Sequence, residues 1–276
     1  MDSFKEYITE RSVSFGTNPQ GQIVILAGGA ASGKGFVYQY GINITGKHLD
    51  VDEVKEMLLR CKPILAYIRE KTGKDLTSFN LKNPEQVLTL HKMVEGLGFA
   101  DIRTKDFFKS VLLAPKDRKP NIIFDVTLKD VQKLITISHM AQSAGYDARD
   151  ISIVWVLDKV SVAMEKNAQR ERTVPADVLL ATHVGASMTM SKFVEDNASM
   201  RQYADGYFYL VFNSVGVDNP VYKSSSGGMW MDVKGRVLLK KPGEGINSRA
   251  MTDEVVNKIR QYVPNPDVWK SISLRK

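Results

Sequence analysis

Lys34 is the residue of this sequence whose surroundings point most directly to chemistry. It closes a glycine-rich segment, Gly-Gly-Ala-Ala-Ser-Gly-Lys-Gly, which follows the apolar run 23–27. Glycines allow backbone N–H groups to turn around an anion, and a lysine at this spacing reaches the β and γ phosphates of a nucleotide. The pattern predicts a phosphate loop for ATP or GTP, with a structural glycine turn as the alternative. The residues expected to hold the nucleotide are Gly28, Gly29, Ala30, Ala31, Ser32, Gly33, Lys34 and Gly35.

Gly35 departs from the phosphate-loop motif, in which a serine or threonine follows the lysine. The hydroxyl group of that residue normally binds Mg²⁺. We expect a water molecule, Ser32 or a nearby carboxylate to replace it, because Mg²⁺ accepts any of these oxygen ligands.

Asp50 and Asp125 end two predicted strands. Ligands of parallel sheets bind at the carboxyl ends of the strands, so carboxylates at these ends are candidates for chemistry. We expect Asp125 to have the role of a Walker B acid, with Asp50 as a second ligand of Mg²⁺. A strand-ending turn residue is the alternative for Asp125.

Asp52 lies two residues after Asp50, and alternate spacing along an extended chain would put both side chains on the same side. A carboxylate here can accept the proton of an attacking hydroxyl group, so we expect one of the two, Asp50 or Asp52, to act as a general base. Asp52 also precedes an amphipathic helical stretch, and the alternative role is that of a helix N-cap.

Arg170 and Arg172 lie two residues apart at the end of a predicted helix, and Pro175 follows them. Positioned guanidinium groups stabilise the charge of a migrating phosphoryl group and can contribute about 10³ to 10⁵ in rate. We expect the pair to lie on a mobile lid over the phosphates. The alternative is an exposed helix end, where arginines complement the helix dipole.

These residues require a scaffold, and the chain alternates apolar runs with helical stretches in a pattern typical of an α/β fold. We predict a parallel sheet of the P-loop NTPase type with helices on both faces, a helical insert, and a C-terminal hairpin followed by a helix. The expected strands are 23–27, 47–50, 121–125, 151–157 and 208–212, with hairpin strands 229–232 and 235–239. The expected helices are 33–42, 53–60, 63–71, 84–95, 104–113, 131–144, 159–170 and 252–262.

Three regions are predicted from these elements. Residues 1–20 form an N-terminal helical extension, 21–215 the core with its helical insert at 56–120, and 216–276 a basic C-terminal extension. From residue 223 onward the last region contains 11 Lys or Arg and 5 Asp or Glu, and it therefore carries most of the chain's net charge of +7. This region could contact a polyanion such as a nucleic acid; a solvated basic face is the alternative.

The composition agrees with an enzyme-sized chain of 276 residues, 43% hydrophobic and 25% charged. No apolar run approaches the ~20 residues that span a bilayer, and the first residues carry no apolar signal segment. We therefore expect a cytoplasmic protein without a membrane partner. A single cysteine, Cys61, excludes an internal disulfide and a multi-cysteine metal site, and the four histidines have no zinc spacing.

At the level of motifs the chain resembles the zeta-toxin-like kinases, a group of P-loop phosphotransferases, over roughly residues 20 to 215. The resemblance rests on the phosphate-loop segment, on Asp-Val-Asp-Glu-Val-Lys from residue 50, on Asp-Val-Thr-Leu-Lys from residue 125, and on Arg-Glu-Arg-Thr-Val-Pro-Ala-Asp-Val-Leu from residue 170. The last segment is the most specific. Departures are Gly35, the Asp-Val-Thr in place of Glu-Gly-Thr or Glu-Thr-Thr, and the long insert.

The resemblance implies an ATP-dependent kinase that phosphorylates a hydroxyl group, which in zeta toxins belongs to a UDP-activated amino sugar. It implies ATP and Mg²⁺ as cofactors, Asp52 as catalytic base, Arg170 and Arg172 as γ-phosphate ligands, and a protein antitoxin or inhibitor as a partner. Asn213, after the last core strand, is where such kinases often have a base-binding asparagine; a turn residue is equally compatible.

Two other functions stay open. One is a nucleic-acid kinase acting on a polynucleotide end or a hydroxymethylated base, which the basic tail and the insert favour. The other is a nucleotide-binding regulator with little turnover, which Gly35 would permit. The acceptor is accordingly a small molecule or a nucleic acid.

Overall fold

The computed structural model of the chain describes residues 15, 20–170, 172–214, 221–223, 229–231, 235–270 and 272. At 51–53, 221–223 and 229–231 it describes the backbone alone. The helical extension predicted at 1–20 lies outside the described residues, apart from residues 15 and 20.

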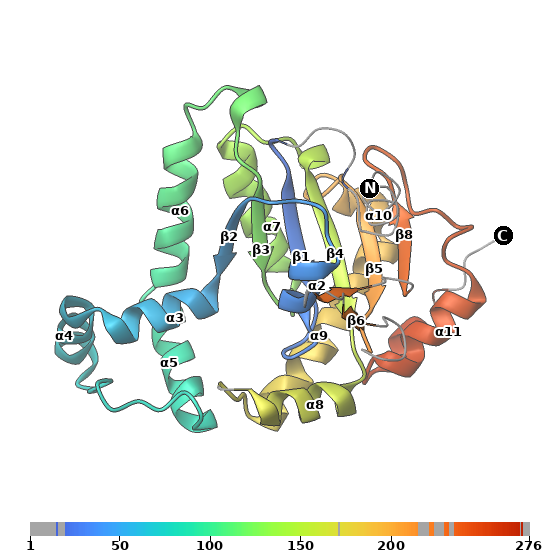
Figure 1. Cartoon of the computed structure of the whole chain (residues 1–276). Helices are drawn as coiled ribbons and strands as arrows, with labels where there is room; N and C mark the ends of the chain where they lie inside the picture. Colours follow the sequence, from blue (N-terminus) through green and yellow to red (C-terminus); the bar gives the residue numbers. More distant parts are fainter. Residues whose placement is uncertain are drawn as a thin grey trace.

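Six strands form one sheet in the order β2-β3-β1-β4-β5-β8 (Figure 1). The first five run parallel, and β8 pairs antiparallel with β5. Their bounds are β1 Ile23–Ala27, β2 Lys47–Asp50, β3 Ile122–Asp125, β4 Ile151–Leu157, β5 Phe208–Phe212 and β8 Arg236–Lys240. The continuous apolar runs of β1, β4 and β5 are buried along their whole length, as expected for strands covered on both faces.

Helices cover both faces of this sheet, so the predicted α/β architecture is confirmed. Alternate residues of β1 contribute to two apolar clusters. Ile23 and Ile25 share one cluster with α7, α9 and α11, whereas Val24 and Leu26 share the other with Val37 of α2. The helices are α2 Lys34–Tyr40, α3 Val51–Arg60, α4 Lys62–Thr72, α5 Pro84–Gly96, α6 Phe99–Val111, α7 Val131–Ser143, α8 Val160–Gln169, α9 Ala176–Glu195, α10 Asn197–Met200 and α11 Asp253–Tyr262.

The point where the connections change direction lies between β1 and β3. The helix after β1 packs on one face and the helix after β3 on the other, while the two strands are neighbours. Such a switch point opens a crevice at the carboxyl ends of the strands, and ligands of α/β sheets bind there. The fold therefore directs attention to the turn after Ala27 and to Asp125.

The predicted helical insert consists of α3 to α6, which project from the β2 edge of the sheet (Figure 1). Helices α3, α4 and α5 have an apolar core of their own, which includes Val54, Leu58, Ile68 and Leu90. Helix α6 packs Phe99 and Ala100 against this core and Phe108 into the main core. The insert is thus a subdomain with its own packing, fixed to the sheet through β2, α3 and α6.

A two-stranded antiparallel pair does form in the C-terminal region, but not between the strands predicted for the hairpin. Strand β7 (Met229–Met231) pairs with β6 (Val221–Lys223), and β8 is hydrogen-bonded to β5 in the main sheet. A two-residue hairpin turn requires residues that accept positive φ, such as Asn-Gly, and Val-Lys does not supply them. Strand β8 therefore extends the main sheet. Ile259 of α11 is buried in the main core, so part of the basic C-terminal region belongs to that core.

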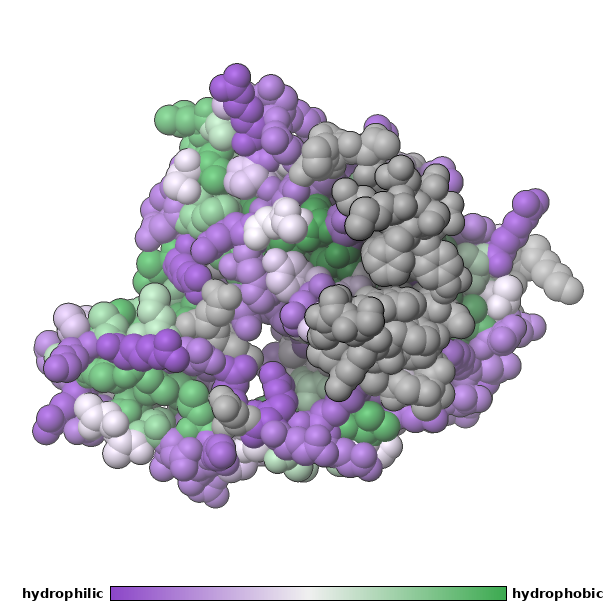
Figure 2. Space-filling view, in the orientation of Figure 1, coloured by the Kyte–Doolittle hydropathy of each residue, from purple (hydrophilic) through white to green (hydrophobic). Residues whose placement is uncertain are grey.

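Among the described residues, no helix combines the length and apolarity needed to cross a bilayer. In the view of Figure 2, green hydrophobic residues are seen over the insert at the left, bordered by purple hydrophilic ones. On the insert, Met57, Tyr67 and Ile102 each expose about half of their surface, at 47%, 45% and 52%. Singly exposed apolar residues of this kind are ordinary on protein surfaces.

Candidate functional site

The turn after β1 requires glycine at three positions. Gly28 and Gly33 have positive φ values of 143° and 83°, and a Cβ atom at Gly28 would lie 2.3 Å from the carbonyl oxygen of Val156. A Cβ atom at Gly29 would lie 2.1 Å from the ring of His183. The loop therefore packs closely against its neighbours on both sides, and larger residues would displace it.

Helix α9 holds the middle of this loop through a pair of residues that the sequence analysis did not identify. The hydroxyl group of Thr182 accepts a hydrogen bond of 2.8 Å from the N–H of Ala30, and Nε2 of His183 lies 2.9 Å from the Ala30 carbonyl oxygen. Burial lowers the pKa of His183, and the nearby charge of Lys34 lowers it further. A neutral His183 with its proton on Nε2 donates this bond. The N–H and the carbonyl of Ala30, which belong to two successive peptide groups, are thus both bound to α9, so the Ala30 N–H expected to hold the nucleotide is directed to Thr182 in this structure.

Asn213 holds the other end of the loop. It is fully buried after β5, and its Nδ2 donates a hydrogen bond of 2.9 Å to the Ser32 carbonyl oxygen. A Cβ atom at Gly33 would lie 2.2 Å from the same Nδ2. Asn213 therefore contacts the phosphate loop itself, and the base contact expected of it stays a prediction.

Lys34, the first residue of α2, lies where the loop meets the strand ends. Its Nζ donates to the carbonyl oxygens of Gly28 and Gly29 at 3.1 and 3.2 Å, and it lies 3.6 Å from Oδ1 of Asp125. Asp50 is the register partner of Asp125 in the parallel pair β2–β3, so the two Cα atoms are separated by about one strand spacing, ~4.8 Å. Lys34, Asp50 and Asp125 are thus brought together, and their roles toward phosphates and Mg²⁺ stay predictions.

The expected geometry of Asp52 was wrong. Strand β2 ends at Asp50 and α3 begins at Val51, so Asp52 lies in the first turn of a helix. The alternation that applies to an extended chain does not hold across this boundary. The N-cap alternative does not fit these bounds either, because a cap precedes the first helical residue. The backbone carries Asp52 directly past the ends of β2 and β3; its role as base stays a prediction.

The donor set at this crevice fits a nucleotide with Mg²⁺. Asp50 and Asp125 supply neighbouring carboxylates, and Mg²⁺ is usually held by one or two carboxylates together with phosphate oxygens and waters. Ser32 is fully buried, and its Oγ has no hydrogen-bond partner among the described residues. Within the described side chains no group of three or more His, Cys, Asp or Glu gathers as a metal cluster. Phosphate oxygens and waters would therefore complete the metal's ligands.

Gly35 offers a direct test of the missing hydroxyl group, because a Cβ atom there would meet nothing within 4 Å. We expect Gly35→Ser to fold normally and to lower the Mg²⁺ concentration required for half-maximal phosphoryl transfer, with a modest change in maximal rate. Gly35→Ala is the matched control, since it adds the Cβ atom without the hydroxyl group. Identical Mg²⁺ titrations of the two variants would show that position 35 has no access to the metal.

Arg170 and Arg172 have different environments. Arg170 is the C-cap of α8 and is exposed, whereas the Arg172 side chain is only 15% exposed. Nη1 of Arg172 lies 4.0 Å from Oε1 of Glu56, which is on α3 one helical turn after Asp52. Arg172 is therefore next to the helix turn that carries the candidate base.

Asp158 is a further residue that the sequence analysis missed, although it directly follows the apolar strand β4 and the rule used for Asp125 would have found it. It is fully buried, and burial raises its pKa. It forms an ion pair with Lys166 of α8 and accepts a hydrogen bond of 3.1 Å from the Ser214 hydroxyl group. Asp158 thus ties α8 to the end of β5, beside Asn213.

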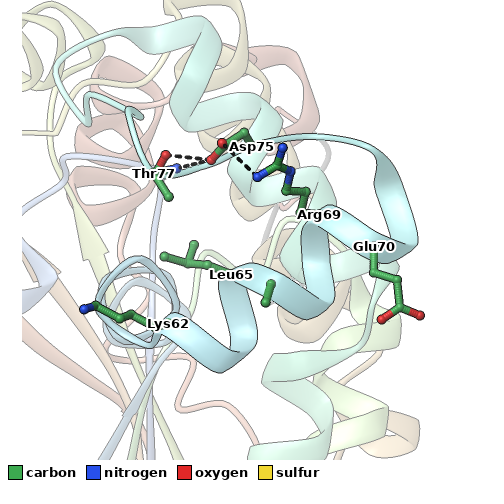
Figure 3. Close-up of a pocket in the computed structure, with 7 residues that line it drawn as sticks. Lys62, Leu65, Arg69, Glu70, Asp75 and Thr77 are labelled. Carbon is green, nitrogen blue, oxygen red and sulfur yellow. Dashed lines mark hydrogen bonds and ion pairs between the residues drawn. The ribbon is translucent and has the colours of Figure 1, made fainter.

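A hollow beside Asp50 extends the site toward the insert. Its polar lining consists of Asp50, Arg103, Thr104 and Lys133, from β2, α6 and α7. Its apolar lining consists of Leu49, Val54, Ala100, Phe124, Val126, Ile137 and Met140. A second cavity of about 500 Å³ lies on the insert alone, between α4 and the chain after it (Figure 3). There Asp75 binds Thr77 and Arg69, and no predicted site residue takes part.

No protein-family model matches the sequence, and no curated protein matches it. Similar solved structures include the complex AvrRxo1-ORF1:-ORF2, at 14% identity and TM-score 0.45, covering 96% of this chain and 73% of that chain. Its form with ATP has 12% identity and TM-score 0.38, with 96% and 80% covered. The PezAT chromosomal toxin-antitoxin system of Streptococcus pneumoniae has 12% identity and TM-score 0.38, with 77% and 76% covered. These likenesses are too distant to support a function, which must come from the site.

Proposed function

We propose that this chain is an ATP-dependent kinase that transfers the γ-phosphate to a hydroxyl group of its acceptor. The observation that carries the proposal is the group formed by Lys34 and Asp125, with Nζ and Oδ1 3.6 Å apart, beside the glycine loop at the switch point of the sheet. A lysine and carboxylates at this position match the needs of nucleotide phosphates with Mg²⁺. Gly28 and Gly33, with positive φ, allow the close approach of backbone to phosphate.

In the proposed mechanism the acceptor oxygen attacks the γ-phosphorus as the bond from this phosphorus to the β,γ-bridging oxygen breaks, and ADP leaves. Asp52 accepts the proton of the acceptor hydroxyl group. Lys34 and the two arginines stabilise the negative charge of the transferring group. Asp50 and Asp125 would hold Mg²⁺, which neutralises phosphate charge when it is bound.

The acceptor is proposed to approach from the side of the insert, near Arg103 and Lys133; the hollow beside Asp50, at about 20 Å³, has room only for about one water molecule and does not itself hold the acceptor. A UDP-activated sugar is the acceptor class that the motif resemblance favours. A protein antitoxin as partner rests on the same resemblance. A polynucleotide acceptor is the second candidate, supported by the basic C-terminal region.

The test is a γ-phosphate transfer assay with labelled ATP against UDP-sugars, nucleosides, RNA and DNA. We expect transfer to a UDP-sugar with a weak dependence on salt. Transfer to RNA or DNA with affinity that falls steeply as salt rises would favour the second candidate, because only polyanions release many counterions on binding. ATP binding without transfer to any acceptor class would instead indicate a nucleotide-binding regulator.

Substitutions of Asp52 and Asp125 by asparagine are expected to affect different properties of the transfer reaction, its turnover and its Mg²⁺ requirement. Asp52→Asn should lower turnover by about 10² to 10⁴ at nearly constant ATP affinity, because loss of a general base affects the transfer step. Asp125→Asn should instead raise the Mg²⁺ concentration needed for transfer. Turnover and Mg²⁺ titrations of both variants make the comparison. An Asp52→Asn protein that unfolds or retains the wild-type rate would rule out the base.

A further inference from the structure

The backbone just after Arg172 is held by the buried side-chain amide of Asn167. Asn167 of α8 is only 8% exposed. Its Nδ2 donates a hydrogen bond of 2.8 Å to the Val174 carbonyl oxygen, and its Oδ1 accepts one of 3.0 Å from the Val174 N–H. Both polar atoms of one side chain therefore fix the same residue, two positions after Arg172. A buried side chain with both groups satisfied in this way restricts the backbone it binds.

The same chain is attached to the insert from the other side. The Thr173 hydroxyl group donates a hydrogen bond of 3.0 Å to the Lys82 carbonyl oxygen, and the Thr173 N–H donates one of 3.3 Å to the Leu81 carbonyl oxygen. Leu81 and Lys82 lie in the connection between α4 and α5. The residue directly after Arg172 is thus hydrogen-bonded to the insert.

We propose that Asn167 and Thr173 are positioning residues for Arg172, and that the insert, through Thr173, determines where this arginine lies. The inference rests on the proposed function, since Arg172 is the residue that would touch the transferring phosphate. Asn167 fixes the chain after Arg172, Thr173 joins it to the insert, and the guanidinium group is thereby held next to α3 and Glu56. The segment that was expected to form a mobile lid is hydrogen-bonded to the insert in this structure. Preorganised charge of this kind is effective because it needs no rearrangement during the reaction.

The kinetic test uses Thr173→Val, which removes the hydroxyl donor and keeps the branched shape, and Thr173→Ser, which restores the donor. Thr136→Val is the matched control, because the Thr136 hydroxyl group also donates an exposed hydrogen bond to a backbone carbonyl oxygen, but to Gln132 within α7 and not between two segments of the chain. We expect Thr173→Val to lower turnover about five-fold, the factor that one neutral hydrogen bond supplies. ATP affinity should be unchanged, Thr173→Ser should recover the rate, and Thr136→Val should behave as wild type.

A second measurement does not require kinase activity. Trypsin cleaves after arginine and can reach the Arg172–Thr173 bond only when the segment around it separates from Asn167 and from the insert. The rate of cleavage at this bond therefore measures the equilibrium between the attached and the separated segment. Asn167→Ala leaves the cleavage sequence unchanged and should raise cleavage at this bond at least about five-fold, because it removes hydrogen bonds that close the chain. Thr173→Val should raise it similarly.

The two measurements separate the inference from the proposed function. Faster cleavage in both variants of a chain that transfers no phosphate would support the attachment and refute the kinase. Unchanged cleavage in both variants, or a turnover of Thr173→Val equal to that of wild type in an active kinase, would overturn the positioning role. If Asn167→Ala fails to fold, Thr173→Val alone decides, since its changed hydroxyl group is exposed at the surface.

Discussion

Arg172→Ala is expected to lower the rate of phosphoryl transfer by about 10³ to 10⁵, the range measured for arginines that stabilise the transferring phosphoryl group. The Arg172 side chain is only 15% exposed and lies next to the helix turn of Asp52. A mostly buried guanidinium group acts in a medium of lower dielectric constant than water, where its charge has a greater effect. The loss should fall on turnover, with ATP binding reduced less, because the charge that it stabilises develops during transfer.

Arg172→Lys tests whether the planar guanidinium group is needed, and Arg170→Lys provides the comparison within the same segment. A lysine keeps the charge and loses two-pronged contact, so even Arg172→Lys should lower the rate. Arg170 is exposed at the end of α8, and its substitution should have the smaller effect. The measurement is turnover at saturating ATP for both single variants and the double variant, with thermal unfolding as the check on folding. Full turnover in all three would limit Arg172 to a structural contact with α3 and remove the most specific support for the kinase.

The strands that form the floor of the site could be predicted because their signal is local. The run 151–157 is apolar apart from Ser152 and is fully buried in β4, and the apolar runs 23–27 and 208–212 are likewise buried in β1 and β5. The rule that ligands of parallel sheets bind at the carboxyl ends of the strands selected Asp50 and Asp125 as candidates, whereas their register pairing was not predicted. The helix that contains Asp52 could not be separated from the strand before it, because one residue decides the boundary and propensity does not resolve it.

Contacts between distant segments were beyond the sequence. Thr182 and His183 meet Ala30 across more than 150 residues, and nothing in their local spacing marks them as supports of the loop. The strand with which β8 pairs is likewise determined by tertiary structure, because an antiparallel strand can pair with any exposed sheet edge of suitable register. The attachment of Thr173 to Lys82 belongs to the same class. Motifs identified the chemical groups, and long-range packing determines how rigidly they are held.

Lys34→Ala is expected to abolish detectable phosphoryl transfer, with a loss of at least about 10² to 10³, the cost of removing one preorganised donor to developing charge. The Lys34 ammonium group is buried beside Asp125 and bonded to the loop carbonyl oxygens of Gly28 and Gly29. It is therefore held where the β and γ phosphates are proposed to lie. Transfer of label from γ-labelled ATP at saturating Mg²⁺ measures the effect.

The fold should survive this change, because Asn213, Thr182 and His183 hold the loop through contacts in which Lys34 has no part. Lys109→Ala is the matched control, since it removes an equal charge from an exposed lysine of α6 whose ion pair with Asp106 lies at the surface. Circular dichroism and thermal unfolding of both variants should be close to wild type. A folded Lys34→Ala protein with wild-type transfer would rule out the phosphate loop as the ATP site, since no rearrangement of the glycine turn can replace the cation that the β and γ phosphates require.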